Sequence, residues 1–320
     1  MPGFYTHYLF GTTTYPHIKQ HYLKQIIGEE KRAYCLGLEG PDFLFYFLPS
    51  YVFHKQNLGS ILHEQRTGCF LFHLLETCDS FEDLEERQIA EAYVAGFLGH
   101  YYLDCTCHPY VYCFTDFHMK KNQRYYSKHI EFETELDRKL LEHYLHCKPS
   151  QIPQHQVIRL SGKQWDVVST LLSKALCMTF PEKFSNYSIL KVAVLSMRLG
   201  TFALSDQHGL KRPVIRKLER LFWGYYPISP LIPTDTPKIS QDVCNVDKQT
   251  WHNPWKPEIT SNASFFDLFE DARKDYLKAL AKADRLFATR KAGYAPDLLR
   301  DLKNFLGNRN YHSGLSNDNV

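Results

Sequence analysis

Two stretches with helical spacing each carry a histidine and a carboxylate four positions apart. His100 and Asp104 lie in EAYVAGFLGHYYLDCTCHPYVY, and His129 and Glu133 lie in RYYSKHIEFETELDRKLLEHYL. Residues four apart stack on one face of an α-helix, so each helix presents an imidazole and a carboxylate in the same direction. Imidazole and carboxylate groups are the ligands of hydrolytic zinc sites, which keep one coordination position for water.

A chain with 16 histidines contains such pairs by chance, so the surroundings of the first pair decide its interpretation. The helix around His100 is apolar on every side, and no Lys or Arg occurs between Arg87 and Lys120. A buried carboxylate is costly unless a cation or hydrogen-bond donors compensate it. A metal ion is therefore the simplest partner for Asp104. His108 continues the spacing of four, and because Pro109 follows it we expect the helix to end there.

Composition limits the class of protein. The 320 residues suit one large domain, and 44% hydrophobic residues can build a sizeable core. The net charge of +3, without a Lys/Arg block, argues against a long nucleic acid as partner.

No apolar run in the sequence is long enough for a transmembrane helix. The first residues lack the features of a signal peptide, and the nine cysteines are an odd number, so we expect reduced thiols and a cytoplasmic protein.

Hydrophobic periodicity predicts an all-α fold, a multi-helix single domain. The ligand pairs on the helices of His100 and His129 predict a metal site between these central helices. We expect one domain over 1–306 and a disordered polar tail over 307–320, with residues 1–15 irregular and a long loop over 224–263. The predicted helices cover 16–27, 56–78, 82–108, the His129 segment to about 147, 162–179, 184–205, 210–222, 264–289 and 295–306.

Three further residues are candidates for the same site. His7 lies in FYTHYLFG, Asp42 follows a Gly-Pro turn, and His63 lies in ILHEQRTG among apolar neighbours. His54 competes with His63, which is preferred because of its helical surroundings. In chain order the candidate metal ligands are His7, Asp42, His63, His100, Asp104, His108, His129 and Glu133.

In the order and type of these residues the chain resembles the bacterial zinc-dependent phospholipase C family. GHYYLDCTCHPY is similar to the family's His-Tyr-x-x-Asp run followed by a later His, and KHIEFETELD is similar to its final His-x-x-x-Glu helix. The motifs cover roughly residues 1–145. The resemblance implies an all-helical domain that holds two or three zinc ions.

The resemblance also implies how the ligands are shared. One zinc would take Asp42, His63, His100 and Asp104, a second would share Asp104 and take His7, and a third would take His108, His129 and Glu133. Asp42 would in addition be the catalytic base.

The chain departs from the family pattern at two places. Secreted members use the amino group of an N-terminal tryptophan at the second zinc, whereas loss of Met1 here would expose Pro2. The spacing from Asp104 to His108 is shorter than usual in the family, which leaves His118 as an alternative ligand.

The resemblance therefore implies a zinc-dependent phosphoric ester hydrolase that attacks a small phosphodiester or a phospholipid with metal-activated water. Peripheral membrane contact is compatible with this activity, and the sequence does not indicate an oligomeric state. One alternative is a nucleotide or single-strand nucleic-acid hydrolase, because fungal single-strand nucleases share the fold. The other is a non-catalytic helical scaffold protein with one structural zinc.

Overall fold

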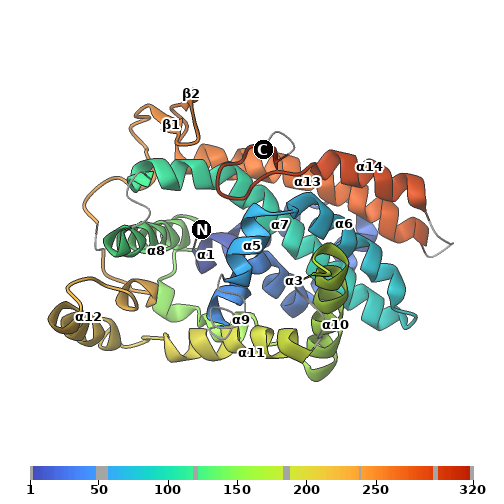
Figure 1. The fold of residues 1–320 in the computed structure, drawn as a ribbon, viewed down its shortest axis with the longest axis horizontal. Helices are drawn as coiled ribbons and strands as arrows, with labels where there is room; N and C mark the ends of the chain where they lie inside the picture. The colour runs from blue at the N-terminus through green and yellow to red at the C-terminus, as the bar shows by residue number, and fades with distance from the viewer. Residues whose placement is uncertain are drawn as a thin grey trace.

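Helices dominate the computed structural model, which describes residues 3–47, 57–117, 122–182, 188–237, 239–290 and 295–317. The sheet within these ranges is one antiparallel hairpin of β1 (Trp251–Asn253) and β2 (Lys256–Ser261). The prediction of an all-α fold is confirmed, and the hairpin lies inside the predicted loop (Figure 1). None of the helices in the described ranges combines the length and hydropathy that a membrane span requires.

The central element is α7 (Leu84–Phe114), a helix of 31 residues. It begins at Asp83, whose side chain accepts a hydrogen bond of 2.9 Å from the Glu86 N–H. Almost every residue from Ile89 to Val111 is buried, because other helices surround this stretch. The most extensive contacts of α7 are with α3 (Lys31–Leu38) and α13 (Phe265–Arg290). His100 and Asp104 therefore lie at the centre of the molecule.

The other helices pack around this core (Figure 1). They are α1 (Phe4–Thr14), α2 (His21–Glu29), α5 (Leu58–Glu64), α6 (Thr67–Thr77), α8 (Gln123–Leu145), α9 (Gln154–Val157), α10 (Gly162–Thr179), α11 (Ser188–Ala203), α12 (Lys211–Phe222) and α14 (Pro296–Leu306). Short 3₁₀ segments join them: η1 (Tyr15–His17), η2 (Gly40–Tyr46), η3 (Cys78–Ser80), η5 (Pro149–Gln151) and η6 (Ser229–Leu231).

Four local predictions are wrong. The helix predicted over 16–27 is interrupted, because residues 18–20 are non-helical between η1 and α2. Residues 4–14 form a helix rather than an irregular segment, and its buried residues pack into the core. The helix predicted over 56–78 is two helices, because Arg66 has a left-handed φ of 50° between α5 and α6. The helix of His100 continues past Pro109 to Phe114. Proline removes one helical hydrogen bond, and the tertiary contacts of α7 compensate that loss.

The prediction of a disordered tail is wrong for residues 307–317. Tyr311 is 1% exposed, and its N–H donates a hydrogen bond of 3.1 Å to the His63 carbonyl. Gly314, with a φ of +67°, lies so close to α7 that a Cβ there would be 2.2 Å from the Cys105 carbonyl oxygen. Cys105 is the residue whose carbonyl loses its helical donor at Pro109. The buried Tyr311 and the close packing of Gly314 on α7 thus order a segment that is polar in composition.

Candidate metal centre

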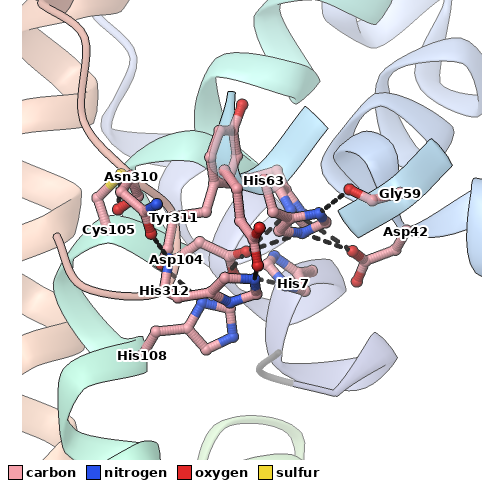
Figure 2. Close-up of polar contacts among 12 residues, drawn as sticks. His7, Asp42, Gly59, His63, Asp104, Cys105, His108, Asn310, Tyr311 and His312 are labelled. Carbon is pink, nitrogen blue, oxygen red and sulfur yellow. Dashed lines mark hydrogen bonds and ion pairs between the residues drawn. The ribbon is translucent and has the colours of Figure 1, made fainter. Parts of the chain in front are cut away.

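The carboxylate of Asp104 lies at the centre of four imidazoles (Figure 2). Its Oδ2 is 3.0 Å from Nε2 of His100 and 3.6 Å from Nε2 of His63. Its Oδ1 is 3.3 Å from Nε2 of His7, and Oδ2 is 3.5 Å from Nδ1 of His108. All five side chains are completely buried. They come from α1, α5 and α7, so the long-range fold brings the predicted residues together.

Asp42 contributes a second carboxylate to this cluster. Its Oδ1 lies 3.2 Å from Nε2 of His63 and 3.8 Å from Nε2 of His100. Two groups of three have potential ligand atoms within 4.8 Å of one another: His7 with Asp42 and His100, and His63 with His100 and Asp104. His100 belongs to both groups. The arrangement therefore has the compact, shared ligand set that neighbouring metal ions require.

Three of the histidines use one ring nitrogen for a backbone carbonyl and keep the other free. His63, His100 and His108 contact, through Nδ1, the carbonyl oxygens of Gly59, Leu38 and Tyr311 at 2.6, 3.1 and 2.8 Å. A carbonyl can only accept, so Nδ1 carries a proton, and in the neutral ring Nε2 has the lone pair. Metal-binding histidines in proteins are oriented by this type of contact.

The buried polar atoms of the cluster provide a test of whether a metal fits. Among the described residues, no hydrogen-bond partner is found for both nitrogens of His7, both oxygens of Asp104, Oδ1 of Asp42 and Nε2 of His63, His100 and His108. Buried polar atoms are normally satisfied, and leaving them unsatisfied destabilises the fold. Divalent zinc binds these nitrogen and oxygen donors. The residues therefore fit zinc.

The ionisation of the cluster also suits a cation. Burial opposes the charge of Asp104, but the imidazoles of His100 and His108 hold the pKa of this carboxyl well below its usual range. Burial lowers the pKa of His100 and of His108, which favours their neutral, ligating form. Burial also lowers the pKa of His63, but contacts with Asp104 and Asp42 outweigh it and raise the value to about 9. Metal binding at His63 would release this proton.

Local geometry fixes the positions of Asp42 and His7. Gly40 has a φ of +48°, and a Cβ at this position would lie 2.3 Å from the His100 ring. Only glycine lets η2 pass this close to His100 and present Asp42.

His7 is fixed through the start of α1, where Asp137 of α8 accepts hydrogen bonds from the Tyr5 and Thr6 N–H groups at 3.1 and 2.7 Å.

His129 and Glu133 form a separate pair beside this cluster. Nε2 of His129 is 2.9 Å from Oε1 of Glu133, and Nδ1 lies 3.1 Å from the Thr115 hydroxyl. The Tyr112 ring connects the two parts, with centroids 4.8 Å from His129 and 5.7 Å from His108. Within the described residues, neither group of three potential ligands includes His108, His129 or Glu133. The three residues predicted to hold a third zinc therefore lie outside the two groups of three, and His129 and Glu133 lie beside the central cluster.

The alternative ligands His54 and His118, and Pro2 at the N-terminus, lie outside the described residues. His63 and His108, the preferred residues, both lie in the central cluster.

Sequence reasoning missed His312, which was assigned to the polar tail. Its ring lies against His63, with centroids 5.4 Å apart and planes 12° apart, and 5.5 Å from His108 (Figure 2). Its Nδ1 is 3.1 Å from the Tyr112 hydroxyl oxygen. The one signal in the sequence is the adjacent Tyr311, a large aromatic residue inside a polar segment.

Comparison with known proteins agrees with this geometry. A family model described as zinc dependent phospholipase C matches residues 6–175, which is more than half of the chain. The matched region contains all eight predicted ligands. No curated protein and no solved structure matches the chain.

Proposed function

Because the chain belongs to the zinc-dependent phospholipase C family, we propose that it is a zinc-dependent phosphoric ester hydrolase acting on a phosphodiester or phospholipid. The observation that carries the proposal is the cluster of buried imidazole nitrogens around Asp104 that have no hydrogen-bond partner among the described residues. A purely structural histidine would use both ring nitrogens or expose one to water.

The proposed ligands divide into three sets. Asp42, His63, His100 and Asp104 would hold one zinc ion. His7 would hold a second zinc ion with Asp104, and the closeness of His7, Asp42 and His100 supports two neighbouring ions. His108, His129 and Glu133 would hold the third ion, so we propose two or three ions per chain.

When bound, zinc polarises a phosphoryl oxygen and lowers the pKa of a coordinated water towards neutrality. Asp42 would serve as the general base for the attacking water. Asp42 is 7% exposed, whereas Asp104 is fully buried, so Asp42 is the more accessible of the two carboxylates to solvent. Asp104, held ionised by His100 and His108, balances cationic charge in the centre.

A nucleotide or single-strand nucleic-acid hydrolase is the second candidate, and one aromatic cluster favours it. Trp255 lies 4.9 Å from the Tyr112 ring and 4.2 Å from the Phe117 ring, and Tyr112 lies next to His129. Aromatic faces beside a phosphoesterase site can stack a nucleobase.

The cysteines support a reducing compartment. Their number, nine, is odd, which is typical of a protein with reduced thiols and is the basis for proposing a cytoplasmic location.

Metal content followed by a substrate panel tests the proposal. Purified protein loaded with zinc is analysed for metal and then assayed with p-nitrophenylphosphorylcholine, phospholipid vesicles and dinucleotides. We expect two or three zinc ions and hydrolysis of a choline phosphodiester or lipid, with His100→Ala inactive and the exposed His208→Ala unchanged. Preferred cleavage of dinucleotides would favour the second candidate. One tightly bound zinc without hydrolysis would indicate the scaffold alternative and overturn the proposal.

A further inference from the structure

Helix α12 buries two charged side chains, whereas its apolar face is exposed to solvent. Arg212 and Glu219 are 3% and 1% exposed. The large apolar side chains of the same helix are exposed: Val214, Leu218, Leu221 and Phe222, at 59, 47, 76 and 69%. A surface helix normally buries its apolar stripe against the core. This reversed orientation is the least expected feature of the surface.

The buried charges explain why the helix is held this way round. Arg212 donates a hydrogen bond of 3.0 Å to the Ile232 carbonyl. Glu219 accepts from the N–H groups of Ile228 and Ser229 at 2.5 and 3.0 Å. These contacts fix α12 to the segment around η6. Because these hydrogen bonds fix the opposite side of α12, its apolar face points to solvent.

The outer face of α12 joins a similar face of α11. On α11 the exposed apolar residues recur at helical spacing: Val192, Leu195, Leu199 and Phe202. Phe202, Leu210, Val214 and Ile215 line one open hollow between the two helices. Both helices lie along the same edge of the molecule, at the bottom of Figure 1. We call the exposed apolar side chains of residues 192–223 the α11–α12 surface.

Charge distinguishes this surface from an ordinary apolar patch. Residues 188–223 contain seven Lys and Arg but two acidic residues, a surplus of five positive charges in a chain whose total is +3. One of the acidic residues is the buried Glu219, and the other, Asp206, accepts from the N–H groups of Leu210 and Lys211, both at 3.0 Å. Lys217 and Arg220 are exposed on the helix itself. Two of the seven cations pair with acidic residues outside this stretch, Lys191 with Asp166 and Arg216 with Glu131. The exposed Lys217 and Arg220 therefore supply the positive charge that borders the apolar face of α12.

We propose that the α11–α12 surface docks onto an anionic lipid bilayer, with α12 lying in the plane of the interface. An apolar face bordered by Lys and Arg, with Phe222 and the 54% exposed Trp223 at its end, is typical of interfacial helices. A second copy of the chain fits less well, because self-association would bring two basic surfaces together. The proposal deepens the proposed phospholipase function, and its choice of a lipid partner rests partly on that function.

Sedimentation with vesicles tests the apolar contribution. The full-length protein is mixed with phosphatidylcholine vesicles with and without phosphatidylserine. We expect binding to the anionic vesicles, and about a tenfold or larger loss for the double variant Leu221→Ser with Phe222→Ser. Leu84→Ser, at a 53% exposed apolar residue remote from α12 in sequence, is the matched control and should bind like wild type.

A charge variant tests the second part of the surface. Lys217→Glu with Arg220→Glu should weaken binding to anionic vesicles about tenfold, and added salt should weaken wild-type binding in the same direction. Lys19→Glu with Arg32→Glu changes two exposed cations elsewhere and is the control. Equal vesicle binding by either surface variant and wild type would overturn the proposal.

Two further readouts separate this inference from its alternatives. Hydrolysis of soluble p-nitrophenylphosphorylcholine should be unchanged in both surface variants, because neither touches the metal centre. Absence of any hydrolysis with intact vesicle binding would refute the proposed function but leave the docking surface. The wild-type protein could instead form a dimer without lipid, which the double variant Leu221→Ser with Phe222→Ser would dissociate. That result, combined with no vesicle binding by wild type, would identify a self-association surface and refute the docking proposal.

Discussion

Nδ1 of His108 donates a hydrogen bond of 2.8 Å to the main-chain carbonyl of Tyr311, although 203 positions separate the two residues. The N–H of Tyr311 in turn donates to the His63 carbonyl at 3.1 Å. One residue near the C-terminus therefore contacts two helices that carry proposed zinc ligands. This contact holds the His108 ring in one orientation and leaves Nε2 for a metal, as an outer-sphere partner of a metal ligand does.

Deletion of residues 308–320 is expected to weaken zinc binding. His108 would lose the acceptor that orients its ring, which typically costs about 10- to 100-fold in metal affinity. Zinc titration against a competing chelator measures the effect, and circular dichroism checks that the helices remain. Deletion of residues 318–320 alone is the control. Unchanged zinc affinity in the longer deletion would show that the tail does not support the site.

His100→Ala and Asp104→Asn are each expected to lose zinc and the stability that zinc confers. A ligand present at about 1,000 times its Kd stabilises the folded state by about 4 kcal/mol. Thermal unfolding with and without zinc should therefore show a large zinc-dependent increase in Tm for wild type and a small one for both variants. His208→Ala, at an exposed position, should behave like wild type. Full zinc content in either variant would remove that residue from the ligand set.

Asp42→Asn is expected to reduce turnover more than stability. Asp42 lies on the short segment η2 rather than in a central helix, and loss of a general base typically lowers the rate about 10²- to 10⁴-fold. The variant should keep the zinc bound by His108, His129 and Glu133. The measurements are kcat on a soluble phosphodiester, Tm and metal content. Near-normal kcat in the metal-loaded variant would exclude Asp42 from the mechanism.

Gly40→Ala is expected to destabilise the protein by about 2–4 kcal/mol, because it adds a steric overlap with His100 to an unfavourable φ. Gly209→Ala is the matched control: its φ is +68°, but a Cβ there meets nothing within 4 Å. The control should lose only about 1–2 kcal/mol. Urea unfolding compares the two variants. Equal losses would mean that η2 relaxes away from His100.

Asp267 should contribute stability that disappears in acid. Hydrogen bonds from Lys248 and Ser264 lower the pKa of this carboxyl to about 2, below the ordinary value of 3.8. A lowered pKa in the folded state gives stability that is present above pH 3.8 and is lost as the pH falls towards 2. The group is largely exposed, so the contribution should be less than about 1 kcal/mol. Asp267→Asn should therefore be less stable than wild type at neutral pH and equal to it near pH 2, as measured by urea unfolding.

Sequence spacing was sufficient wherever the geometry is local. His100 with Asp104 and His129 with Glu133 are in contact because residues four apart meet on any α-helix. The helix predicted over 162–179 has the same bounds as α10, and the structure shows that a capping box of Ser161 and Gln164 fixes its start. Proline was a weaker guide, since α7 continues through Pro109 where the surrounding contacts favour the helix.

The sequence alone thus determined the all-helical class, the types of candidate ligand and their pairing within helices, because these depend on intervals of a few residues. The tertiary structure decided that His7, Asp42 and His63 meet at Asp104, that Tyr311 and His312 lie beside the site, and that α12 presents its apolar face outward. Each of these depends on partners far away in the chain. Hydrophobic periodicity predicts that a helix has an apolar face, but only the position of its neighbours decides whether that face is buried.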